Sequence, residues 1–181
     1  MRRFHKQSAH HFLPGITVAE LVVYVGLLAI ISVFLIQSLL TLLVAYRRLQ
    51  GERDVVASAR IAMETLARET QGASSIYTPT SVLDTATSQL SLATPLNPTA
   101  GETRSYVDFY VDNERLYLKR EGSATIALTS ESARVTQFSV KRILAGARET
   151  AEITLEIKSQ SGGALETSSW VKASFTPRGN Y

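Results

Sequence analysis

Residues 15–46 read GITVAELVVYVGLLAIISVFLIQSLLTLLVAY, and this stretch decides how the rest of the chain is interpreted. From Leu21 to Tyr46 it holds 26 residues without a charge. A helix of that length extends about 39 Å, more than the roughly 30 Å hydrocarbon core of a bilayer. The one charged residue between Gly15 and Arg47 is Glu20. A charge inside a membrane segment costs about 2.5–3.5 kcal/mol on insertion scales, so we expect a spanning helix whose carboxylate needs a partner.

The residues before this stretch form a basic leader with Arg2, Arg3 and Lys6 and no acid. The chain has 19 Lys and Arg and 16 Asp and Glu, so removing three leader bases leaves 16 of each from residue 16 onward. The positive-inside rule therefore places the leader in the cytoplasm. A secretory signal peptide has a shorter apolar stretch and a small-residue cleavage site after it. A plain signal anchor explains the leader and the apolar run, but not Gly15 or Glu20.

The order Gly15, Ile16, Thr17, two apolar residues, Glu20 and a long apolar run resembles the precursors of type IV pilins and pseudopilins. The resemblance implies that a prepilin peptidase cuts between Gly15 and Ile16 and methylates the new N-terminus at Ile16. Glu20 would pair with the amine of a neighbouring subunit and set the axial register. In two departures, Ile16 stands where Phe is commonest, and Gln37 stands near the position where many major pilins have proline.

The same resemblance implies where the protein is found and what it binds. It would be a single-pass membrane protein before assembly, with its C-terminal domain extracytoplasmic, in the periplasm or at the cell surface, and part of a pilus or pseudopilus afterwards. Its partners would be the prepilin peptidase, other pilin or pseudopilin subunits through the N-terminal helix, the inner-membrane assembly platform and membrane lipid. Nucleic acid is the least favoured of the partners considered.

Beyond Tyr46 the helix is predicted to continue out of the membrane as an amphipathic helix over residues 47–72, with Gly72 as its stop signal. Glu64 and Arg68 are four residues apart and are expected to pair on its outer face. Apolar side chains at spacings of three and four predict one stripe that needs a partner surface, namely Val55, Val56, Ala59, Ala62, Met63, Leu66 and Ala67.

Residues 73–103 are rich in Ser, Thr, Pro and Ala and read as an exposed loop with one short strand at Gln89–Ala93. From residue 104 the apolar period changes to two, which predicts five or six antiparallel strands. Their expected features are a hairpin turning at Asp112-Asn113, strands around Ile126–Leu128, Phe138–Val140 and Ile153–Ile157, a turn at Gly162-Gly163, and a last strand with Val171, Ala173 and Phe175 on one face and Trp170 on the other.

The predicted fold is therefore α+β, with one long N-terminal helix packed on a small antiparallel sheet. The expected segments are a cleaved leader (1–15), a transmembrane or filament-core helix (16–46), an amphipathic helix (47–72) and a β-rich extracytoplasmic domain (73–181). This order is similar to the minor pseudopilins of the J type and to minor pilins. The segments Arg60–Glu69 and Val135–Phe138 resemble that subgroup.

No catalytic constellation is recognisable, and we predict a protein that is not an enzyme and has no cofactor or metal. The chain has no cysteine, and its histidines, His5, His10 and His11, all lie in the leader. Asp108, Asp112 and Glu114 lie close in sequence, but a calcium loop needs more oxygen ligands at ordered spacing. Four aromatic residues fit a stacking surface for single-stranded DNA, although on strands they more often pack against one another: Tyr106, Tyr110, Tyr117 and Trp170.

Two classes of function follow. The first is a structural, minor subunit of a type IV pilus or of a type II secretion or competence pseudopilus. The second is a membrane-anchored extracytoplasmic binding module that acts outside a filament. The pair Gly15 and Glu20 favours the first, because a simple anchor needs neither residue.

Overall fold

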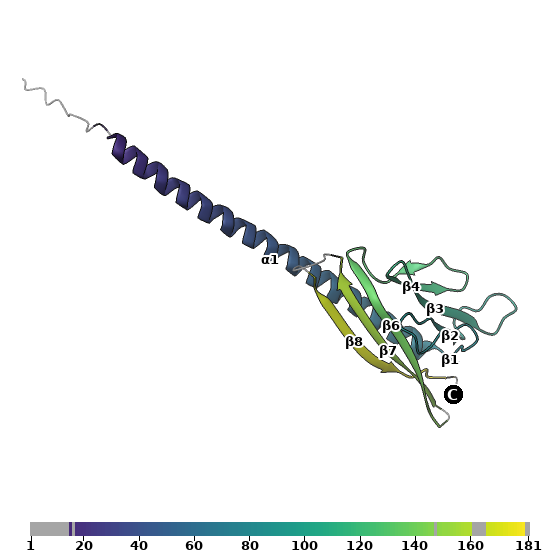
Figure 1. Cartoon of the computed structure of the whole chain (residues 1–181). Coiled ribbons are helices and arrows are strands. Elements are labelled where there is room, and N and C mark those ends of the chain that lie inside the picture. Colours follow the sequence, from purple (N-terminus) through teal and green to yellow (C-terminus); the bar gives the residue numbers. More distant parts are fainter. Residues whose placement is uncertain (1–14, 16, 147, 161–165, 180–181) are drawn as a thin grey trace, which may run out of the picture. The chain divides into compact units, whose positions relative to one another are not determined.

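The computed structural model describes residues 15, 17–146, 148–160 and 166–179. The leader up to residue 14, Ile16 and the expected turn at Gly162-Gly163 therefore lie outside the described residues. The chain divides into two compact units, one ending at Leu43 and one that runs from Val44 to Tyr181. Helix α1, Val18–Gly72, is 55 residues long and contributes to both units (Figure 1). The predicted long N-terminal helix is confirmed.

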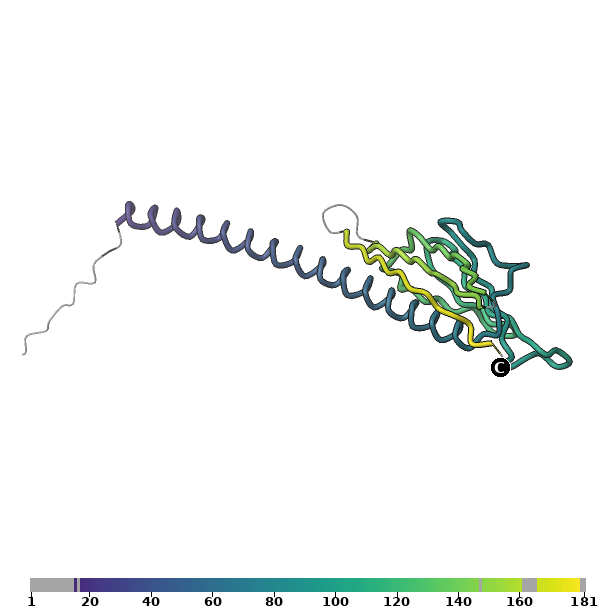
Figure 2. Tube along the Cα trace, turned by 90° about the horizontal axis from the view of Figure 1, so that it is seen from below, coloured from purple at the N-terminus to yellow at the C-terminus, as the bar shows by residue number. Residues whose placement is uncertain are grey.

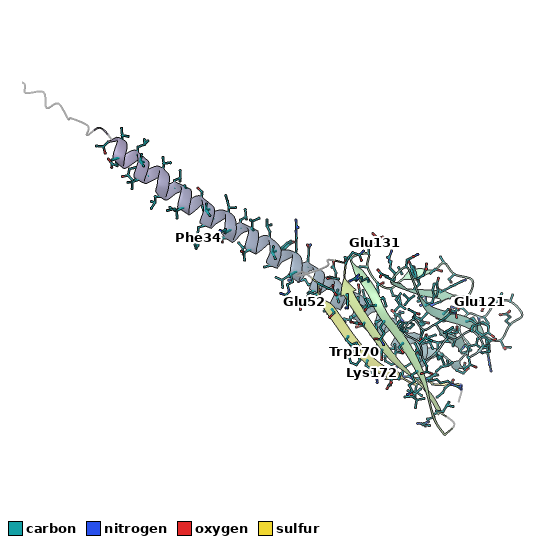
Figure 3. The ribbon with its side chains drawn as sticks, in the orientation of Figure 1. Phe34, Glu52, Glu121, Glu131, Trp170 and Lys172 are labelled. Carbon is teal, nitrogen blue, oxygen red and sulfur yellow. The ribbon has the colours of Figure 1, made fainter. Side chains whose placement is uncertain are left out.

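The first unit consists of the N-terminal part of α1. Its large apolar side chains from Val18 to Leu43 are between 47% and 81% exposed, and Phe34 projects away from the helix in Figure 3. The helix is long and apolar enough to cross a membrane. Two hydroxyls return to the helix backbone, since Ser32 Oγ donates to the carbonyl of Leu28 at 2.8 Å and Thr41 Oγ1 donates to that of Gln37 at 2.9 Å. The surface of this part of α1 is consequently almost wholly apolar.

In the second unit, α1 buries one side against the strands. Five of the predicted stripe residues are buried: Val55, Ala59, Ala62, Met63 and Leu66. Val56 was wrongly included, because it is 53% exposed. Successive helical residues point about 100° apart, which places Val56 just beyond the edge of a buried side whose middle lies near Val55 and Leu66. The buried side is completed by three polar residues that hydrophobic periodicity does not reveal: Ser58, Thr65 and Thr70.

The predicted pairing of Glu64 with Arg68 is wrong. Glu64 Oε1 accepts a hydrogen bond from Arg60 Nε at 2.7 Å, while Arg68 Nε lies 3.8 Å from Glu69 Oε1. A helical residue reaches partners four positions away in either direction. Exposed pairs of this kind are worth little, so charge spacing alone does not select between Arg60 and Arg68.

The first sheet has five strands in the order β1-β2-β3-β4-β5, and all neighbours are antiparallel (Figure 1). The strands are β1 (Ser75–Ile76), β2 (Leu90–Thr94), β3 (Ser105–Asp112), β4 (Arg115–Arg120) and β5 (Ile126–Ala127). Every residue of β2 is buried. The segment 73–103 thus contributes more to the core than the exposed loop that its composition predicts, since Ile76, Leu90 and Leu92 all belong to the core.

The hairpin between β3 and β4 turns one residue later than predicted. Asp112 pairs with Arg115 in the strand register, and the two turn residues are Asn113 and Glu114. Both have positive φ, 47° and 59°. A two-residue turn of type I′ requires positive φ at both positions, and asparagine tolerates it well.

The second sheet has three antiparallel strands in the order β6-β7-β8. They are β6 (Ala133–Ala145), β7 (Arg148–Ser159) and β8 (Ser168–Phe175). The alternation predicted for β7 is confirmed, since Ile153, Leu155 and Ile157 are all 0% exposed. The prediction for β8 also holds: Trp170 is 61% exposed, and Val171 is half-buried against the core.

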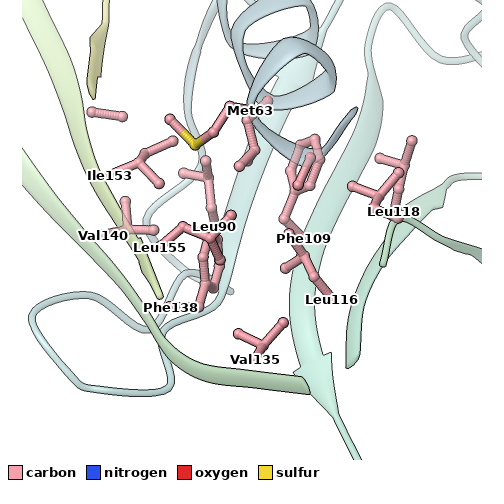
Figure 4. Close-up of a cluster of buried hydrophobic side chains, with 14 of the residues drawn as sticks. Met63, Leu90, Phe109, Leu116, Leu118, Val135, Phe138, Val140, Ile153 and Leu155 are labelled. Atoms are coloured by element: carbon pink, nitrogen blue, oxygen red, sulfur yellow. The ribbon is translucent and has the colours of Figure 1, made fainter. Parts of the chain in front are cut away.

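From residue 104 onward the described residues form six strands, β3 to β8, so the predicted number of five or six is confirmed. The single sheet is wrong, because with β1 and β2 the strands are divided between two sheets. Both sheets and the buried side of α1 enclose one core (Figure 4). Met63 from α1, Phe109 from β3, Phe138 from β6 and Ile153 from β7 all belong to it. Alternation within a strand specifies which side chains face inward. Because the strands of both sheets alternate with the same period of two, this alternation does not show which strands belong to which sheet.

Close packing and polar contacts fix α1 along the strands. Figures 1 and 2 show β8 running beside the second part of α1. A Cβ added at Gly51 would lie 3.4 Å from Cβ of Ser159, so this glycine allows close approach to β7. Further along α1, Asp54 Oδ2 accepts a hydrogen bond from Ser132 Oγ at 2.7 Å, and Glu69 Oε1 accepts one from Arg120 Nη2 at 2.6 Å.

Candidate functional site at the start of α1

Thr17 caps the N-terminus of α1. Its Oγ1 accepts a hydrogen bond from the backbone N–H of Glu20 at 3.3 Å, and its carbonyl accepts one from the N–H of Leu21 at 3.1 Å. A Thr followed three residues later by Glu has the sequence of a capping box, in which the hydroxyl satisfies a free N–H of the first turn. The helix therefore begins two residues after the expected cut, for a local reason encoded in Thr17 and Glu20.

The carboxylate of Glu20 already has one partner on its own helix. Its Oε1 accepts a hydrogen bond from the Tyr24 hydroxyl at 3.1 Å, one turn further along. Both residues are exposed. A carboxylate offers about four lone-pair sites on two oxygens, and Oε2 has no bonded partner among the described residues. Tyr24 can thus orient the carboxylate and leave it able to receive a cation from outside the helix. An acid in the first turn is also favoured by the helix dipole.

Gly15, the residue that the sequence places at the cut, is exposed, and a Cβ added to it would meet nothing within 4 Å. Ile16, the expected site of methylation, lies outside the described residues. The structure thus brings Thr17, Glu20 and Tyr24 together by hydrogen bonds, and it leaves the space around Gly15 unoccupied by other described residues. Sequence analysis missed the cap by Thr17 and the contact of Tyr24, although the Thr-x-x-Glu spacing and the i, i+4 position of Tyr24 were both visible.

The acidic and aromatic residues weighed in the sequence analysis do not come together as a metal site or as one stacking surface in the described part of the chain. Among the described residues there is no cluster of three or more His, Cys, Asp or Glu placed to hold a metal ion, so Asp108, Asp112 and Glu114 do not form one. Asp112 instead accepts a hydrogen bond from Asn113 Nδ2 at 3.3 Å.

The aromatic residues do not form one stacking surface. Tyr110 and Tyr117 face each other across β3 and β4 with ring centroids 5.8 Å apart, which is cross-strand packing. Tyr106 contacts Tyr77 instead, with ring centroids 4.7 Å apart, a partner that sequence analysis did not identify. Trp170 lies on the other sheet, well away from Glu121 at the end of β4 (Figure 3).

Comparison with known proteins gives no family assignment. No protein-family model matches the chain, and no curated protein or solved structure is significantly similar to it. The functional argument therefore rests on the residues and geometry described above.

Proposed function

We propose that this protein is a minor structural subunit of a type IV pilus or of a type II secretion or competence pseudopilus. The observation that carries the proposal is the start of α1. A helix capped by Thr17 begins three residues after Gly15, at Val18, and presents the carboxylate of Glu20 in its first turn. It then exposes an uncharged and almost wholly apolar surface to Leu43. A simple membrane anchor needs the apolar surface, but it needs neither the glycine nor the carboxylate.

In this proposal the prepilin peptidase removes the leader after Gly15 and methylates Ile16. After cleavage the new N-terminal amine is positive at neutral pH. The Glu20 carboxylate of one subunit receives the amine of the next, through the oxygen that Tyr24 leaves free. Desolvation offsets much of the attraction in such a pair. Its main effect is therefore to select one axial register among helices whose apolar surfaces would otherwise slide past one another.

The rest of the chain supports this role. Before assembly α1 holds the protein in the inner membrane, with membrane lipid around it and the assembly platform as its partner. The second unit lies outside the cytoplasm, in the periplasm or at the cell surface. It contains a closed apolar core of its own. We therefore propose that the apolar part of α1 makes the contacts between subunits in the filament, and that the strands form the surface that the filament exposes to solvent.

Cleavage between Gly15 and Ile16 is the first test. When the full chain is produced together with a prepilin peptidase, mass spectrometry should find a mature N-terminus at methylated Ile16. Gly15→Ala should still be processed, because one methyl group adds little bulk beside the bond to be cut, whereas the bulky side chain of Gly15→Leu should block the peptidase and leave the precursor. An intact Met1 in the membrane fraction of the peptidase-producing cells would contradict the proposal. It would favour the anchored binding module instead.

A further inference from the structure

A cleft lies on the outer side of the five-stranded sheet, away from the core. Its volume is about 360 Å³, and it is lined by Tyr77, Thr80, Tyr106, Asp108, Lys119 and Glu121. The strand alternation explains this set. Val107 and Phe109 point into the core, so their neighbours Tyr106 and Asp108 point outward. The cleft belongs wholly to the second unit, and the proposed filament contacts of α1 do not involve it.

One wall of the cleft is aromatic and half-buried. The rings of Tyr77 and Tyr106 have centroids 4.7 Å apart and are tilted by 51°, so they form an angled aromatic surface. The backbone N–H of Tyr106 donates to Glu121 Oε2 at 3.1 Å, which holds that carboxylate beside the rings. Partial burial, and then the neighbouring Tyr77, raise the pKa of the Tyr106 hydroxyl.

The other wall carries two charges that the fold does not use. Asp108 and Lys119 are directly opposite each other in the register of β3 and β4. Among the described residues, neither side chain makes an ion pair or a hydrogen bond. Asp108 is nevertheless half-buried, and partial burial of a polar group without a partner is unfavourable. An acceptor and a donor are thus held close together beside an aromatic wall with nothing bound to them.

We propose that this cleft binds a sugar ring of a neutral glycan. A pyranose has an apolar C–H face that packs on the tilted tyrosine rings, and its equatorial hydroxyls are donors and acceptors together. Those hydroxyls match the carboxylates of Asp108 and Glu121, which accept, and the ammonium of Lys119, which donates. A volume of about 360 Å³ accommodates one to two such rings.

The charges of the lining argue against the other two classes of ligand. Single-stranded DNA also stacks on aromatic rings, but its affinity comes largely from lysine and arginine beside the phosphates. Here two carboxylates outnumber one lysine. A cationic ligand would suit the tyrosines and carboxylates, but Lys119 would repel it. A neutral polyhydroxylated ligand is the class that meets no repulsion.

The test uses the full chain in lipid nanodiscs, because maltoside detergents would themselves present sugar. Saturation-transfer NMR is recorded with millimolar chitohexaose, maltohexaose and cellohexaose in turn. We expect at least one of them to receive saturation at its ring C–H protons. Tyr106→Ala should weaken that binding by about tenfold or more, as expected for the loss of an aromatic packing surface, while Tyr106→Phe should retain most of it.

The matched control is Tyr117→Ala, since Tyr117 is a half-buried tyrosine of the same sheet that does not line the cleft. Asp108→Ala and Lys119→Ala should weaken binding without unfolding, because these side chains make no internal contact that the fold requires. Absence of saturation transfer to all three sugars would overturn the proposal. An equal loss of sugar binding in Tyr117→Ala and Tyr106→Ala would also overturn it. The same holds if a dT dodecamer binds more tightly than the sugars and its binding depends on Tyr106.

Discussion

Replacing Glu20 by alanine is expected to reduce incorporation into filaments by about tenfold or more while leaving cleavage and membrane insertion intact. Without the carboxylate, the positive amine of the neighbouring subunit would be buried among apolar side chains with no negative partner. Burial of an unpaired charge is unfavourable. The cap of α1 should survive, because Thr17 Oγ1 accepts from the backbone N–H of residue 20 and not from its side chain. Cysteine cross-linking between adjacent helices in sheared filaments, compared with the amount of processed protein in the membrane, measures the effect.

Two further variants separate assembly from local helix stability. Glu20→Gln keeps the size and polarity but removes the charge, so it should assemble as poorly as Glu20→Ala. Tyr24→Phe removes only the hydroxyl that donates to Oε1, and it should assemble almost normally. If Glu20→Ala were incorporated at the level of the wild type, the carboxylate would have no role in assembly.

Leu66→Asp should strongly destabilise a fragment comprising residues 47–181. Leu66 is 0% exposed and lies in the core between α1 and the sheets. An uncompensated buried charge costs about 3–5 kcal/mol. Small domains are stable by only about 5–15 kcal/mol. Urea unfolding followed by circular dichroism should show mixed helix and strand for the parent fragment and a lost or strongly lowered transition midpoint for the variant.

Ile61→Asp is the matched control, because Ile61 is an apolar residue of the same helix that is 52% exposed. Its substitution should change the free energy of unfolding by no more than about 0.5 kcal/mol. Equal stability of the two aspartate variants would show that α1 does not pack on the strands through the side that contains Leu66. An all-helical spectrum of the parent fragment would contradict the whole α+β arrangement.

Local periodicity was a good guide wherever burial alternates within one element. Ile153, Leu155 and Ile157 alternate with polar residues and all face the core, as predicted. It was a poor guide where polar residues are buried. Ser58 lies inside because its Oγ contacts Ser130, accepting from the N–H at 3.2 Å. No hydrophobic pattern can reveal such a residue, since its burial depends on a partner 72 positions away in the chain.

At the candidate site, sequence alone determined most of the features that matter. Gly15, Thr17, Glu20 and the uncharged run after it are local, and the cap of Thr17 on the N–H of Glu20 is a short-range interaction that the order of residues is enough to encode. The division of the strands into two sheets, the burial of all of β2, and the meeting of Tyr77 with Tyr106 were decided only by the tertiary structure. These features depend on which distant segments pair, and pairing is selected by the shared core and the strand register, neither of which is contained in any one stretch of the chain.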